Sequence, residues 1–163
     1  MSVLAQKNIL IGISGGIAAY KVPSLIRLLT KVKSNVKVVM TPSSKEFVTP
    51  LTLSTVSEND VFSEFISKKN NNPSWNNHVK LAEWADIFII APATSNTISS
   101  MANARCDNLL LACYLSSNCP VFVAPAMDLE MFKNNLNQVN IKKLKDNLTD
   151  VLPVGSGSLA SGL

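Results

Sequence analysis

The sequence is poor in residues that bind metals or form cross-links, with one histidine and three cysteines among 163 residues. The cysteines, Cys106, Cys113 and Cys119, are odd in number and lack C-x-x-C spacing, so neither a metal site nor a disulfide framework is expected. Reduced thiols in a core or in a subunit contact are the simplest interpretation, and they favour a cytoplasmic protein.

Long apolar runs and blocks of like charge are also lacking. Apolar stretches such as LLLACYL at 109–115 are far shorter than the ~20 residues that a membrane span needs. The net charge of +4 comes from scattered lysines, so no nucleic-acid surface is expected. The N-terminus runs almost directly into a strand-like segment, and no signal peptide is expected.

A dinucleotide-binding fingerprint is absent as well. The G-x-G-x-x-G frame that begins at Gly12 has Ser14 and Ile17 where glycines are needed. The second strand-like segment ends in MTP at 40–42, without the acidic residue that holds a ribose diol. NAD is therefore disfavoured as a ligand.

What the sequence does contain is an alternation of strand and helix patterns in a globular composition, 47% hydrophobic and 16% charged. Continuous apolar segments predict buried strands at 8–14, 36–40, 86–93 and 120–124, with an edge strand at 151–154. Helical spacing predicts helices at 18–33, 78–84 and 98–115, the last in one or two pieces. The alternation predicts a parallel sheet covered on both faces, in one domain.

Three segments carry weaker signals. Residues 44–66 show short helical pieces with little patterning. The polar stretch at 67–77 has too little apolar surface to order itself, so it is expected to be a mobile loop. Residues 141–147 are rich in lysine and expected to be exposed.

Four polar segments directly follow predicted strands: SGGIAAYK, TPSS, APATSNT and APAMDLEMF. In a parallel sheet they would meet at the carboxyl edge, where ligands bind. The glycines of SGGIAAYK let backbone amides approach an anion, and the other three segments offer mainly hydroxyls and amides. Neutral donors of this kind suit one phosphate and a polar ring system, as in a mononucleotide. The alternative is that these residues only cap helices.

Four stretches, GISGGIAAYK, NHVKLAEWAD, APATSNT followed by ARCDNLL, and PAMDLEMF, occur together in order. With them the chain resembles the homo-oligomeric flavin-containing cysteine decarboxylases, which include the phosphopantothenoylcysteine decarboxylases of coenzyme A biosynthesis. The resemblance implies a Rossmann-like doubly wound parallel sheet, a flavodoxin-like three-layer α/β/α arrangement, over residues 1–163. It also implies FMN as the cofactor.

The resemblance also implies roles for particular residues. The FMN site would be formed by Gly15, Gly16, Ile17, Thr41, Phe47, Thr94, Ser95, Asn96, Thr97 and Met101. The catalytic base would be His78, and the substrate would be bound by Ala126, Met127, Asp128 and Ser161. The segment PAMDLEMF is expected to form a substrate lip, beneath which Met127 and Met131 pack. The implied reaction is oxidation of a cysteinyl thiol to a thioaldehyde, loss of carbon dioxide and re-reduction.

Two positions depart from the family pattern. Asp128 stands where the family usually has asparagine, and an ionised carboxylate repels a substrate carboxylate that an amide would bind. Asp128 is therefore expected either to be protonated, to accept from the substrate's amide N–H, or merely to cap the following helix. Ser161 stands where a flap cysteine is expected, which puts the final proton transfer in doubt.

Rival functions follow from these departures. Oxidative decarboxylation of a peptide's C-terminal cysteine fits the absent flap cysteine, and a flavin-binding regulatory relative without turnover fits both substitutions. A flavin prenyltransferase is less favoured, because no arginine–lysine group suits a prenyl phosphate. The resemblance further implies a trimer or dodecamer, with a phosphopantothenate–cysteine ligase as a fused or separate partner. The chain is expected to be a truncated piece of such a bifunctional protein or a complete decarboxylase.

Overall fold

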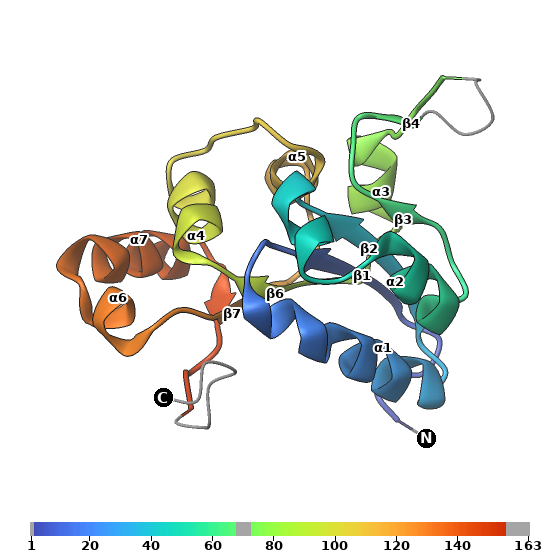
Figure 1. Cartoon of the computed structure of the whole chain (residues 1–163), viewed down its shortest axis with the longest axis horizontal. Helices are drawn as coiled ribbons and strands as arrows, with labels where there is room; N and C mark the ends of the chain where they lie inside the picture. Colours follow the sequence, from blue (N-terminus) through green and yellow to red (C-terminus); the bar gives the residue numbers. More distant parts are fainter. Residues whose placement is uncertain (1, 68–72, 156–163) are drawn as a thin grey trace.

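A computed structural model describes residues 2–67 and 73–155 (Figure 1). Its centre is a six-stranded sheet in which every strand pair is parallel. The strands, in sheet order, are β3 (Val61–Phe62), β2 (Asn35–Met40), β1 (Asn8–Ile13), β6 (Ile87–Ala93), β7 (Val121–Pro125) and β8 (Asp150–Val151). Without the separate β4–β5 pair, this is the 3-2-1-4-5-6 order of a Rossmann fold, whose chain direction across the sheet switches between β1 and β6.

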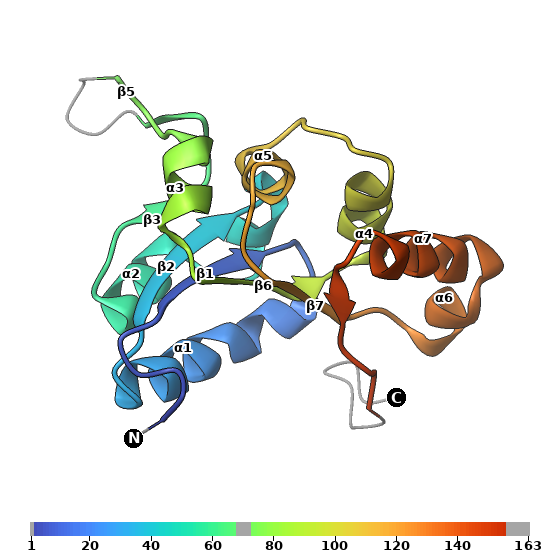
Figure 2. The same ribbon diagram turned by 180° about the vertical axis from the view of Figure 1, so that it is seen from behind.

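Helices cover the sheet from both sides, as Figures 1 and 2 show. One face packs against α1 (Val22–Lys31) and α2 (Pro50–Ser57). The other face packs against α3 (His78–Trp84), α4 (Ser95–Ala102), α5 (Leu109–Leu115) and α7 (Asn135–Asp146). The expected three-layer, doubly wound arrangement is thus confirmed.

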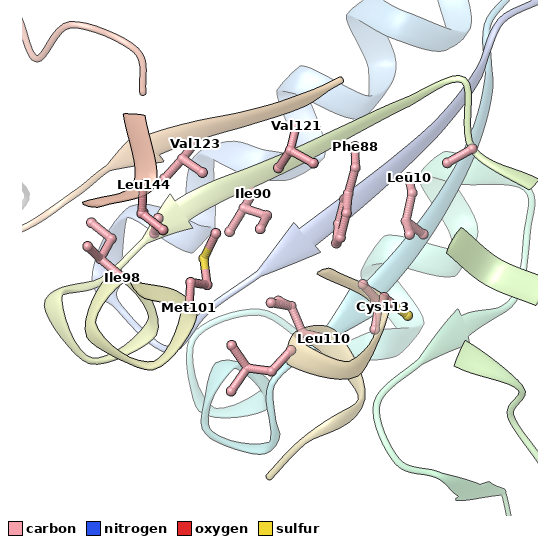
Figure 3. Packing of buried hydrophobic residues seen from close by; sticks show 14 of the residues in the cluster. Leu10, Phe88, Ile90, Ile98, Met101, Leu110, Cys113, Val121, Val123 and Leu144 are labelled. Carbon is pink, nitrogen blue, oxygen red and sulfur yellow. The ribbon is translucent and has the colours of Figure 1, made fainter. Parts of the chain in front are cut away.

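The two cores are separated by the period-2 alternation of the strands. Ile9 and Ile11 face α1, whereas Leu10 between them faces α5. Figure 3 shows the second core, in which Phe88 and Ile90 of β6 meet the helices. Each such fully buried side chain contributes about 1.5–3 kcal/mol to folding relative to an exposed one.

Helix α5 approaches β1 closely at Gly12. A Cβ atom added to Gly12 would lie 3.0 Å from Leu110 and 3.1 Å from Phe88. The glycine therefore lets α5 pack tightly on the centre of the sheet. This contact brings the N-terminal end of α5 to the carboxyl edge of β1, where the candidate site lies.

The helical regions differ in detail from the sequence-based expectation. The first begins as a 3₁₀ helix, η1 (Ile17–Lys21), before α1, and Pro23 lies in the first turn of α1. Residues 98–115 form two helices, α4 and α5, and α4 already begins at Ser95 because Thr94 caps it. A second 3₁₀ helix, η2 (Pro42–Glu46), follows β2.

Other segments correct the sequence-based expectation. The predicted mobile loop at 67–77 is ordered at both ends by an antiparallel pair, β4 (Ile66–Ser67) with β5 (Ser74–Trp75), and residues 68–72 between them lie outside the described residues. The lysine-rich segment belongs to α7, which begins at Asn135 and buries Ile141 and Leu144. The edge strand β8 is shorter than predicted.

Within the described residues, no helix is long and apolar enough to cross a membrane. The three cysteines are free, and Cys113 is fully buried on α5. Burial, and secondarily the nearby Cys106, raises the pKa of the Cys113 thiol to about 12. Cys113 is therefore a neutral core side chain at physiological pH.

Candidate functional site

The end of β1 is fastened to the end of β6 by Ser14. The buried Ser14 hydroxyl donates to the carbonyl of Pro92 at 2.6 Å and accepts from the backbone N–H of Thr94 at 3.0 Å. The backbone N–H of Ser14 donates to the same carbonyl at 3.2 Å. These bonds fix the point at which the two central strands end, which is the switch point of the sheet.

Gly15, the next residue, faces the segment after β2. A Cβ atom at Gly15 would lie 2.4 Å from the Ser43 Oγ and 3.0 Å from the Ser43 backbone carbon. Only glycine fits at this approach without moving η2. The turns after β1 and β2 therefore pack directly against each other.

A pocket of about 230 Å³ opens at this edge. Its walls come from the segments after β1, β2 and β6 and from the beginning of α5. The lining residues are Gly15, Thr41, Pro42, Ser43, Thr94, Asn96, Thr97, Ser100, Asn108 and Leu111. No charged side chain is among them, so the pocket offers a ligand hydroxyls, amides and backbone groups.

Two helices begin at this pocket. The Thr94 hydroxyl caps α4 by accepting from the backbone N–H of Thr97, and the Asn108 side chain caps α5 by accepting from that of Leu111 at 3.0 Å. Capping residues thus also line the pocket, so the two interpretations of these polar residues are compatible. The start of α4 favours an anionic group there.

Of the residues predicted to hold the cofactor, five line the pocket: Gly15, Thr41, Thr94, Asn96 and Thr97. Gly16 lies beside them, because a Cβ atom there would be 3.1 Å from the Thr94 side chain.

Four other predicted cofactor residues lie outside this lining. Met101 is 3% exposed in the core beneath α4, and the Ser95 hydroxyl donates to Asn137 of α7 at 2.6 Å. Ile17 and Phe47 are 58% and 41% exposed on the surface near the pocket-forming turns. Their predicted roles require a ligand that extends beyond the pocket.

Five lining residues were not among the residues assigned to the FMN site, although the first two belong to the TPSS segment expected at this edge: Pro42, Ser43, Ser100, Asn108 and Leu111. Ser100 lies one helical turn after Asn96, so the face of α4 could have identified it. Asn108 precedes an apolar helical run and carried a capping signal. Nothing in the local sequence pointed Leu111 to the pocket rather than to the core.

His78 is the first residue of α3, and it does not line this pocket. The Asn77 side chain caps the helix by accepting from the backbone N–H groups of Val79 and Lys80. The His78 ring is edge-on to Phe65, with centroids 6.1 Å apart and planes at 88°. The Nδ1 atom is buried and has no hydrogen-bond partner among the described residues. Nε2 is therefore the ring nitrogen available to a substrate.

The predicted substrate lip follows β7. The backbone N–H of Ala126 donates to Ala93 at 2.9 Å, which brings the lip next to the end of β6. Met127 packs against the core as expected, whereas Met131 is exposed. Asp128 is the N-cap of the short helix α6 (Leu129–Lys133). Ser161 lies outside the described residues.

The carboxylate of Asp128 makes no capping hydrogen bond, although its backbone is in the extended conformation typical of an N-cap. This finding removes the interpretation that Asp128 serves to cap α6. The side chain is exposed at the carboxyl edge of the sheet. An acceptor at this place is open to a ligand.

Residues 2–161 match the family described as Flavoprotein. A probable phosphopantothenoylcysteine decarboxylase of Streptococcus mutans is 40% identical over 94% of this chain and 92% of its own length. The coenzyme A biosynthesis bifunctional protein CoaBC of Haemophilus influenzae is 40% identical over 98% of this chain. This chain spans 39% of the length of that bifunctional relative.

A solved structure of a mutant PPC decarboxylase complexed with pantothenoylaminoethenethiol has the same fold. Its TM-score is 0.81 with 31% sequence identity, and the match covers 96% of this chain and 87% of that one. These matches confirm the resemblance that the sequence motifs indicated. The chain belongs to the flavoprotein family.

Proposed function

We propose that this chain is an FMN-dependent decarboxylase that converts 4'-phosphopantothenoylcysteine to 4'-phosphopantetheine in coenzyme A biosynthesis. The observation that carries the proposal is the pocket at the switch point, which a flavoprotein-family chain builds from hydroxyls, amides and a sterically required glycine. The relative of similar length from Streptococcus mutans supports the substrate.

The residues of the pocket fit FMN. Gly15 lets Ser43 pack directly against the turn after β1, and both residues line the pocket, so a phosphate there would meet groups of both turns together. Thr94 and Thr97 at the start of α4 offer hydroxyl and backbone donors without a competing carboxylate. Bound FMN supplies the oxidation of the substrate thiol and the later return of the electrons.

His78 and Asp128 are the proposed reacting and binding side chains outside the pocket. Nε2 of His78 would accept the proton of the substrate thiol, because Nδ1 is buried. Asp128 would accept a hydrogen bond from the substrate's amide N–H, since its carboxylate is not used for capping. Ala126 and Met127 would form the wall beside it.

We also propose that the site is shared between copies of the chain, in a trimer or dodecamer. The pocket of about 230 Å³ is smaller than the roughly 300–1,000 Å³ of typical small-molecule sites. His78 does not line it, and Ile17 beside it is exposed. A second copy placed against Ile17 would enlarge the site and could bring in the histidine. Light scattering that finds only a monomer when FMN is bound would contradict this arrangement.

Two further elements complete the proposal. A phosphopantothenate–cysteine ligase, fused or separate, would supply the substrate, as the match to part of a bifunctional relative suggests. Free thiols at all three cysteines support a cytoplasmic location.

The test has two stages. The purified protein is saturated with FMN, and its absorption spectrum and FMN affinity are measured. It is then given 4'-phosphopantothenoylcysteine or a peptide with a C-terminal cysteine, and carbon dioxide is quantified. Release of carbon dioxide from 4'-phosphopantothenoylcysteine, together with formation of 4'-phosphopantetheine, supports the proposal. Turnover of the peptide alone identifies the peptide decarboxylase, and tight FMN binding without turnover of either identifies a non-catalytic relative.

A further inference from the structure

A catalytic histidine is usually oriented through its second ring nitrogen. A carboxylate or carbonyl accepts from that nitrogen and thereby fixes both the tautomer and the ring plane. His78 has no such partner among the described residues, because its Nδ1 is buried without a hydrogen bond. Among the described residues, only contacts other than hydrogen bonds at Nδ1 can hold the plane of this imidazole.

Two aromatic rings contact the imidazole instead. Phe65 stands edge-on at 88° with its centroid 6.1 Å away, and Trp75 is tilted by 41° at 6.5 Å. Both separations lie within the range of favourable aromatic pairs. Phe65 also packs against the core, so its position is fixed from below. Trp75 is 69% exposed and covers the ring from the solvent side.

The local backbone is built to hold these rings in place. Ile66 pairs with Trp75 across the β4–β5 ladder. The backbone N–H of Asn76 donates to the carbonyl of Phe65 at 2.8 Å, and its side chain donates to that of Glu64 at 2.7 Å. Asn77 then caps α3 directly before His78. The two rings and the imidazole are thus fixed within one hydrogen-bonded unit.

We propose that Phe65 and Trp75 are positioning residues, which hold the His78 ring by packing in place of the usual hydrogen-bonded partner. The expected effect on turnover rests on the proposed function, in which His78 is the base. The orientation of the His78 ring by its aromatic neighbours does not depend on that function. Loss of either ring frees the imidazole to rotate. A rotated imidazole affects proton transfer and leaves substrate binding unchanged, so kcat should fall while KM stays constant.

The kinetic test compares two variants of the same strand pair. Trp75→Ala removes a ring that contacts His78, whereas Ile66→Ala removes its cross-strand neighbour, which is not in ring contact with His78. In the FMN-loaded enzyme we expect Trp75→Ala to lower kcat about fivefold to tenfold and Ile66→Ala to lower it less than about twofold. Trp75→Phe should restore most of the activity. Equal losses in the two alanine variants would overturn the proposal, because the strand pair would then act only as structure.

The second test observes the His78 imidazole by NMR and does not depend on enzyme activity. His78 is the only histidine in the chain, so the imidazole protons give a single set of NMR signals. Ring currents of Phe65 and Trp75 should displace these signals from random-coil positions. Trp75→Ala and Phe65→Leu should each move them back and broaden them, while Ile66→Ala should not. Unmoved signals in the first two variants would refute the geometry.

The two tests separate the failure of this proposal from failure of the proposed function. If the wild-type enzyme releases no carbon dioxide but the NMR signals respond as expected, the ring packing stands and the decarboxylase assignment is wrong. A double variant adds a check within the active enzyme. In a His78→Asn background, Trp75→Ala should lower kcat no further, and an additional fivefold loss there would contradict a role through His78.

Discussion

The cofactor pocket differs from the two proposed reacting and binding side chains, His78 at the start of α3 and Asp128 before α6, in how its polar groups are paired. Around the pocket, Ser14 both donates and accepts, and Thr94 and Asn108 cap helices while they line the cavity. By contrast, Nδ1 of His78 has no partner among the described residues, and Asp128, on a different helix, makes no capping bond. Internal hydrogen bonds thus fix the proposed binding surface in advance, whereas the side chains of His78 and Asp128 are not fixed in this way among the described residues.

Loss of the imidazole should have the largest effect. We expect His78→Asn to retain FMN and its yellow colour, because His78 does not line the pocket, and to lower turnover at least ~100-fold, as for loss of a general base. The measurements are the FMN absorption spectrum and carbon dioxide release from 4'-phosphopantothenoylcysteine. Near-normal turnover would remove His78 from the mechanism. Loss of FMN would show that His78 contributes to cofactor binding as well.

A smaller effect is expected in the pocket, and on binding rather than on turnover. Gly15→Ala places a methyl group against Ser43, and we expect the FMN dissociation constant to rise at least about tenfold. Fluorescence quenching of FMN measures it. Ser43→Gly removes the two nearest atoms, so the double variant should recover part of the affinity. No recovery would show that the methyl group acts by another route.

The core beneath α5, the helix that contributes Leu111 to the pocket, should also show a pH-dependent stability. The unfolded chain loses the Cys113 proton above its ordinary pKa of 9.0, whereas the native thiol, with a pKa of about 12, keeps it. The stability due to this neutral thiol is complete below pH 9.0 and is lost as the pH rises toward about 12. At about pH 10.5 the loss should be roughly 2 kcal/mol. Urea unfolding of wild type and of Cys113→Val, each measured below pH 9.0 and at about pH 10.5, isolates the contribution of the thiol. Equal losses of stability in the two proteins would contradict the prediction.

The mildest effect is expected at Asp128. Asparagine keeps an oxygen that can accept from the substrate's amide N–H and removes a charge that weakly repels the substrate carboxylate, so Asp128→Asn should lower KM about threefold to fivefold and leave kcat unchanged. Glu130→Gln, which removes a neighbouring charge paired with Lys133, is the matched control and should change KM less. If Asp128→Asn abolishes turnover, the negative charge of the carboxylate is itself required, and the repulsion hypothesis is wrong.

Much of the fold could be predicted because the buried strands are continuous apolar segments. The strands β1, β2, β6 and β7 were located to within about two residues, since a parallel sheet covered on both faces needs that pattern. The β4–β5 pair was missed, because strands of two residues leave no periodicity to detect. Most of α7 was missed because its buried side is narrow and includes a polar residue, Asn137.

The site was predicted in part for a similar reason. Residues directly after strands, such as Thr41 and Thr94, could be placed because parallel strands end at one edge. Ser95 was placed in the site by its neighbours, but its hydroxyl bonds to Asn137, a tertiary contact that no local pattern reveals. The aromatic contacts of His78 were likewise not predictable, since Phe65 reaches it from the bend before β4, 13 positions earlier in the chain.

The double use of the Ser14 hydroxyl limits the movements that the pocket allows. Separation of β1 from β6 at this end would break both of its hydrogen bonds within a buried environment, where neither group could turn to water. We therefore expect the strand ends beneath the pocket to stay in place when the nucleotide enters or leaves, and any movement to occur in the surrounding turns. The residence time of the cofactor should then depend on surface segments rather than on the sheet.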